Sequence, residues 1–182
     1  MDDIGHPAAI GGALESIDAD AAGPASNGSG LRVRLFEPRD RESTLRLMRQ
    51  LHTVMPFRNQ PFSDEKFDKR LRELLARPNT SVALVAERGT EVVGAAAGHI
   101  APYILSDGPP FCTVEVIVVD FKSPPLRRAK VFLALIAGLK QWAASKGASH
   151  TFVHVTTGSN LKATDKLMRA SGAEIIGGAY VA

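Results

Sequence analysis

The chain has 182 residues, of which 45% are hydrophobic and 23% charged, and it contains one cysteine. This length and composition fit a single globular domain, and no apolar run reaches the roughly 18 residues that a membrane-spanning helix needs. Cys112 has no partner for an internal disulfide, and the acidic start MDDIGH lacks the basic residues of a secretory signal. We therefore expect a cytoplasmic protein without a membrane segment.

The charge is unevenly distributed. Residues 1–30 hold five of the 19 acidic residues and no Lys or Arg, so the rest, with 22 basic and 14 acidic residues, carries a net charge of +8. This first segment is rich in Ala, Gly, Ser and Asp and cannot bury enough apolar area to fold. We expect a flexible acidic tail over 1–30, which a protein partner could hold, and one domain over 31–182.

Regular patterns begin with LRVRLFEP, which alternates apolar and basic residues and predicts a strand over 31–38. Asp40 or Ser43 can cap a helix that runs to about Met55, and Ser63 caps a second helix with apolar residues along one face. SVALVAE and EVVGAAAGHI follow, joined by the turn RGT, and predict a hairpin.

FCTVEVIVVDF, residues 111–121, is an unbroken β-branched run typical of a central strand. A helix is predicted over 131–147, with Gly147 as its stop, and then a strand, HTFVHVT. A helix closed by Gly172 and a last strand or hairpin complete the chain. The order β-α-α-β-β-β-α-β-α-β predicts an α/β (α+β) fold with a mixed sheet, in which ligands bind beyond the carboxyl ends of the central strands, here residues 120–130.

This order resembles that of the GNAT N-acetyltransferase family over residues 31–182. PPLRRAKVFLALIAGLKQWAASKGA is similar to the family's acetyl-CoA segment, with Arg127 at its first position and Lys130 and Phe132 at its glycine positions. SNLKATDKLMRASGAEIIGG is similar to a second family segment, which Asn160 opens.

The resemblance implies a GNAT-like acyltransferase fold with acetyl-CoA as co-substrate. In the family, pantetheine pairs with the free backbone of the strand before the loop, and the loop and helix start bind the pyrophosphate. The implied cofactor-binding residues are Val118, Val119, Asp120, Arg127, Arg128, Ala129, Lys130, Val131 and Asn160.

The loop departs from the family pattern because it has no glycine, and because Pro124 and Pro125 have no N–H to donate. One interpretation is that Arg127, Arg128 and Lys130 replace backbone donors with side-chain cations. The other is that the loop no longer binds the cofactor. Glycine-poor loops of this kind occur in GNAT-like proteins of bacteriophages, so the resemblance extends to a phage-type member.

Acetyl transfer to an amine needs a base, and Glu115 is the best candidate because it is the lone charge in TVEVIVV. We expect burial to raise its pKa. A surface glutamate, or one paired with an arginine, is the alternative, and His154 and His99 are weaker candidates. In the family, acceptors approach over the first two helices, where Phe57, Arg58 and Phe62 could line the site. The alternative is that this segment only connects the two helices and packs its phenylalanines into the core. No residue spacing predicts a metal site.

The sequence is compatible with three functions. The first is an N-acetyltransferase that transfers an acetyl group from acetyl-CoA to an unknown amine acceptor in a direct ternary complex. The second is a catalytically inactive GNAT-like scaffold that acts as a structural or binding protein, for example in a phage virion or a regulatory complex. In either case the chain could form a homo-oligomer. The third, nucleic-acid binding, rests only on the basic body and is the least favoured.

Overall fold

The computed structural model describes residues 30–105, 107–154 and 161–177. The acidic tail, Asn160 and the end of the predicted last strand lie outside this part of the chain. The elements are β1 (Leu31–Leu35), a 3-10 turn η1 (Pro38–Asp40), α1 (Arg41–His52), α2 (Asp64–Leu75), β2 (Ser81–Arg88), β3 (Glu91–Ala101), β4 (Phe111–Val119), α3 (Pro125–Ser145), β5 (His150–Val153) and α4 (Leu161–Ala170).

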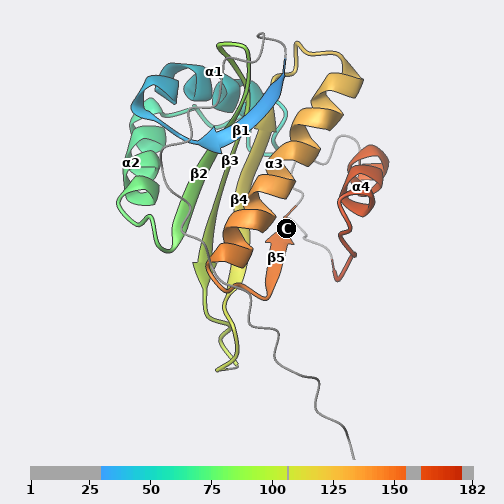
Figure 1. The fold of residues 1–182 in the computed structure, drawn as a ribbon. Helices are drawn as coiled ribbons and strands as arrows, with labels where there is room; N and C mark the ends of the chain where they lie inside the picture. Colours follow the sequence, from blue (N-terminus) through green and yellow to red (C-terminus); the bar gives the residue numbers. More distant parts are fainter. Residues whose placement is uncertain (1–29, 106, 155–160, 178–182) are drawn as a thin grey trace, which may run out of the picture.

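The five strands form one sheet in the order β1-β2-β3-β4-β5. Neighbours run antiparallel except β4 and β5, which are parallel. α3 crosses one face of the sheet, and α1 and α2 cover the other (Figure 1). The predicted mixed sheet with helices on its faces is confirmed.

Each face has its own apolar core. Leu84, Val114, Leu135 and Leu139 are among the residues packed between the sheet and α3, whereas Leu47 is packed with Val85 and Val118 on the α1 side. Only glycine fits where α3 crosses β3, because a Cβ on Gly94 would lie 2.6 Å from Cγ1 of Val131. Burial on both faces explains why β4 is an unbroken β-branched run.

Several predicted turn and cap residues are confirmed. Gly89, Gly147 and Gly172 have φ values of 62°, 75° and 79°, in the left-handed region that glycine adopts most readily. The Ser63 hydroxyl accepts a hydrogen bond from the N–H of Lys66 and caps α2.

The predicted start of the long helix at residue 131 is wrong. α3 begins at Pro125, because proline at the first helical position has its φ already set and loses no hydrogen bond there. The expected loop cations therefore stand within the first turns of a helix. At the other end of the chain, the described residues 173–177 form no strand, and the rest of that predicted element lies outside the description.

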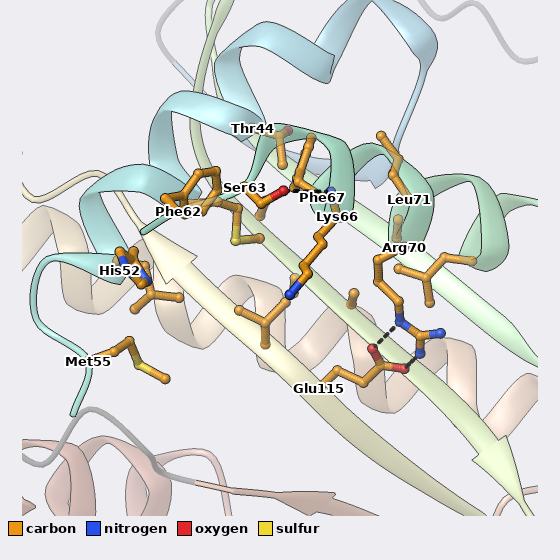
Figure 2. Close-up of a pocket in the computed structure, with 18 of the residues that line it drawn as sticks. Thr44, His52, Met55, Phe62, Ser63, Lys66, Phe67, Arg70, Leu71 and Glu115 are labelled. Carbon is orange, nitrogen blue, oxygen red and sulfur yellow. Dashed lines mark hydrogen bonds and ion pairs between the residues drawn. The ribbon is translucent and has the colours of Figure 1, made fainter. Parts of the chain in front are cut away.

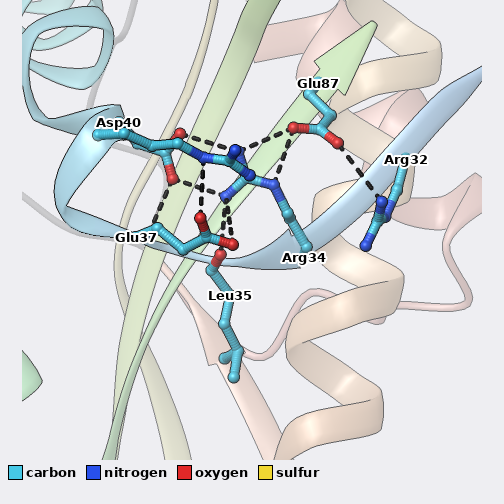
Figure 3. A network of polar contacts seen from close by, with 7 residues as sticks. Arg32, Arg34, Leu35, Glu37, Asp40 and Glu87 are labelled. Atoms are coloured by element: carbon cyan, nitrogen blue, oxygen red, sulfur yellow. Dashed lines mark hydrogen bonds and ion pairs between the residues drawn. The ribbon is translucent and has the colours of Figure 1, made fainter. Parts of the chain in front are cut away.

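Asp40 precedes α1, but its side chain does not cap that helix. The carboxylate instead accepts hydrogen bonds from both Nη atoms of Arg34, at 2.6 and 2.8 Å, and from the N–H of Glu37 at 2.8 Å. Arg34 also donates from Nε to Glu87 at 2.8 Å (Figure 3). Arg34 lowers the pKa of Asp40 more than burial raises it, so this charged cluster ties β1 and β2 to the start of α1.

Candidate functional site

The parallel pair β4–β5 opens partway along β4. The two strands are paired from Phe111–His150 to Val114–Val153, whereas β4 stays paired with β3 as far as Val119. In the described part of the chain, the edge of β4 from residue 115 to residue 119 therefore has no strand beside it. Such an edge presents unpaired N–H and C=O groups to a ligand.

Glu115 is the first residue of this open edge, and it is the extra residue of a β-bulge. Ala97 is paired with Val116 and Gly98 with Val114, which leaves Glu115 without an opposite residue. The residue as a whole is exposed to solvent, but its side chain is only 20% exposed. Most of the exposed area of Glu115 therefore belongs to its main chain. Because of the bulge, Glu115 and Val116 both line the α1–α2 side of the sheet.

The Glu115 carboxylate is held by Arg70 of α2 and His99 of β3. Arg70 donates from Nε to Oε2 at 3.0 Å and from Nη2 to Oε1, and Nδ1 of His99 lies 2.8 Å from Oε1. Arg70 also donates to Glu73 at 3.0 Å. Figure 2 shows the paired Arg70 and Glu115 side chains at one end of a cavity.

These contacts decide the charge of Glu115. Burial raises its pKa, but the hydrogen bonds from Arg70 and His99 outweigh burial, and the net pKa is lowered. The expected increase is therefore wrong, because two donors that are distant in sequence fold against the carboxylate. His99 is brought to this carboxylate, whereas His154 follows β5 and its side chain is exposed.

A cavity of about 490 Å³ lies between the sheet and the helices α1 and α2. Small residues on the sheet, Ala83, Ala95 and Ala97, form part of its floor. Phe62 lines it, whereas Phe57 and Arg58 are exposed outside it. Its volume is typical of small-molecule sites.

The second part of the candidate site is the start of α3, beyond the carboxyl end of β4. The first intrahelical hydrogen bond joins the N–H of Arg128 to the carbonyl of Pro124. Pro124 and Pro125 have no N–H, so Leu126 and Arg127 provide the first amides at this positive end of the helix dipole. The amides of Ala129, Lys130 and Val131 belong to the helix interior.

The predicted cations do not share one face of α3. With about 100° per residue, Arg128 falls on the same side as the buried Leu135, directly over the end of the sheet, and Arg127 falls on its flank. Lys130 is exposed on the outer face, with Ala137 and Gln141. Arg127 and Arg128 are therefore the better-placed pair for an anion at the helix start.

The other predicted cofactor residues are largely inside the protein. Val118 and Val131 are 1% and 2% exposed, and Val119 packs against the core below α3. The Asp120 side chain is buried beside Arg46, at 3.8 Å, and its main-chain N–H binds the carbonyl of Val93. Of these residues, Val118 and Val119 lie on β4, where only their main chain can face a ligand along the open edge.

Arg70 is the residue that sequence analysis missed. It lies three residues after Phe67 and four before Leu74, within the apolar stripe of α2, and a charge in such a stripe is a usable signal. Among the described residues, no group of three His, Cys, Asp or Glu side chains could hold a metal ion, and no helix there is long and apolar enough to cross a membrane.

The model of the acetyltransferase (GNAT) family matches residues 46–170. An aminoglycoside N-acetyltransferase, AAC(6')-Iy, in complex with CoA is 21% identical with a TM-score of 0.67, and the match covers 87% of this chain and 97% of the other. Glucosamine-6-phosphate N-acetyltransferase from Arabidopsis thaliana is 16% identical with a TM-score of 0.60, covering 84% and 97%. An acetyltransferase from Trypanosoma brucei is 24% identical with a TM-score of 0.58, covering 84% and 99%. No curated protein matches the chain.

Proposed function

The chain belongs to the acetyltransferase (GNAT) family, and we propose that it transfers the acetyl group of acetyl-CoA to the nitrogen of an amine. One observation carries the proposal: β4 loses its β5 neighbour at Glu115, the residue that also stands at the end of the cavity. An open strand edge and a cavity thus meet at a charged cluster. One substrate can approach along the open edge of β4 and the other from the face of the sheet that α1 and α2 cover.

The residues at this junction fit acetyl-CoA, which supplies an acetyl group activated as a thioester. The edge of β4 between residues 115 and 119 offers main-chain partners for the amides of the pantetheine arm. The amides of Leu126 and Arg127, with the side chains of Arg127 and Arg128, offer donors for its diphosphate at the start of α3. Of the three cations that could replace the loop glycines, we therefore retain Arg127 and Arg128 and leave out Lys130.

The amine must lose a proton as its nitrogen bonds to the acetyl carbon. The C–S bond breaks with its electron pair on sulfur, so the CoA thiolate leaves and takes up a proton from water. Glu115 holds a proton weakly, because Arg70 and His99 lower its pKa. When Nδ1–H of His99 donates to Glu115, the lone pair of Nε2 is free to accept the proton. We assign His99 as the proton acceptor and Glu115 as the residue that positions it, a refinement of the predicted role of Glu115 as the base.

The test is release of the CoA thiol by the full chain with acetyl-CoA and a panel of alkyl, aryl and sugar amines. We expect turnover with at least one amine, and a loss of about 100-fold in kcat/KM for His99→Ala. Glu91→Gln, an exposed carboxylate at the start of β3, is the matched control for Glu115→Gln. Turnover with no amine, together with no binding of acetyl-CoA, would favour the inactive scaffold.

The split between kcat and KM separates positioning from a merely structural role of Glu115. Glu115→Gln keeps the size of the side chain but removes the carboxylate beside Nδ1 of His99, so kcat should fall while the KM for acetyl-CoA stays close to the wild-type value. A loss of kcat/KM that comes only from a higher KM would contradict the assignment.

A further inference from the structure

The cavity between the sheet and the helices α1 and α2 has predominantly apolar walls. Aromatic side chains come from three segments, with Phe36 after β1, Phe62 before α2 and Phe67 within α2. Met48 and Met55 line it from α1 and the turns that follow. Methionine side chains adapt to ligands of different shape, and aromatic rings offer flat apolar surface.

The space exists because the sheet side is built from small residues. Ala97, next to the bulge, and Ala95 and Ala83 stand where larger side chains would fill the gap below α2. An unfilled apolar cavity loses dispersion contacts along its walls, and a ligand of matching chemistry restores them. The alanine floor therefore leaves room for an apolar group inside the domain.

Several polar groups of the cavity are engaged by the protein itself, whereas the Thr44 hydroxyl, which also lines it, is buried without a hydrogen-bond partner among the described residues. Arg70 and Glu115 bind each other, Ser63 caps α2, and Nε2 of His52 lies 2.7 Å from the carbonyl of Gln60. Lys66 reaches over the cavity from α2 (Figure 2). A hydroxyl-rich amine would lose its water here without an equal number of replacement hydrogen bonds.

We propose that the acceptor is an amine carried on an apolar alkyl or aryl body, which lies in this cavity with its nitrogen toward Glu115 and His99. The inference rests on the proposed function, since it identifies the acceptor class of the same site. The paired charges at one end and the aromatic and methionine walls at the other set the orientation: nitrogen at the open edge of β4, apolar body below α1 and α2.

The test measures kcat/KM for n-butylamine, n-hexylamine and n-octylamine, with phenethylamine as the aryl acceptor and glucosamine as the hydroxyl-rich one. Each methylene buried in the cavity should raise kcat/KM by about fourfold until the space is full. Phenethylamine should exceed glucosamine. A flat alkyl series, or glucosamine as the best acceptor, would overturn the proposal even though acetyl transfer itself was confirmed.

A substitution in the cavity tests whether the dependence of kcat/KM on alkyl chain length arises there. Ala97→Leu fills the floor beside Glu115, so the octylamine-to-butylamine ratio of kcat/KM should fall by about tenfold or more. Ala137→Leu, on the exposed face of α3, adds the same group elsewhere and should leave the ratio unchanged. An equal ratio in both variants would contradict the assignment, and the wild-type alkyl series tests it even if Ala97→Leu fails to fold.

Failure of the proposed function has a different signature. If no amine is acetylated, calorimetric titration of the wild type with octylamine and butylamine still reports on the cavity. Tighter binding of octylamine that Ala97→Leu removes would support an apolar ligand site without transfer, and no difference between the two amines would overturn it.

Discussion

Replacing Arg70 with methionine removes both guanidinium contacts to Glu115 while keeping a side chain of similar length on α2. Side-chain exposure is 49% for Arg70 and 20% for Glu115, so solvent screens the pair and its contribution stays near the upper end for surface pairs, about 1 kcal/mol. For a domain of this size that corresponds to a decrease of about 2–4 °C in Tm.

The pH dependence of this loss has a definite sign. Glu115 has a lowered pKa in the folded state, so its contribution is fully present above the pKa of about 4.3 of an unfolded glutamate and is lost as the pH falls through the folded value. The stability difference between wild type and Arg70→Met should therefore be constant at neutral pH and shrink in acid.

Urea denaturation at a series of pH values measures this difference, with Lys69→Met, an exposed cation on the same helix, as the control. An unchanged midpoint at neutral pH, or a difference that grows as the pH falls, would refute the reasoning. In that case Arg70 would not be what lowers the pKa of Glu115.

Two further changes test the frame around the site. Asp40→Asn removes the carboxylate that binds both Nη atoms of Arg34, where the Arg34 and Asp40 side chains are 10% and 3% exposed, and leaves Glu87 as the closest remaining anion. We expect the free energy of urea unfolding to fall by about 3 kcal/mol. A loss below about 1 kcal/mol would show that the cluster is not what ties β1 to α1. Gly94→Ala places a methyl group against Val131 and should lower the free energy of unfolding by about 1–3 kcal/mol. Thermal and urea denaturation measure this loss. A neutral effect would mean that α3 can shift away from β3.

Local sequence patterns were sufficient to predict most helices and strands, but not to predict which side chains contact one another. Alternation and the β-branched run predicted the strands, and Ser63, Gly89 and Gly147 were read correctly because caps and left-handed turns depend on a few adjacent residues. The start of α3 was missed because PPLRRA was matched to a family loop, although proline in the first helical turn is a start signal in its own right.

The chemistry of the candidate site depends on contacts that are distant along the chain. Glu115 was identified as a lone charge in an apolar strand, but Arg70 is 45 residues away and His99 16, and only the fold brings their donors to the carboxylate. The bulge that turns Glu115 toward the cavity is equally invisible in the sequence of β4 alone, because it arises from the register against β3.

The most direct test of the account is isothermal titration of the full chain with acetyl-CoA. The open edge of β4 and the start of α3 predict one binding site per chain with a dissociation constant in the micromolar range, weakened at least tenfold by Arg128→Ala. No heat of binding at millimolar acetyl-CoA would contradict the central claim that these two elements hold the acetyl donor beside Glu115.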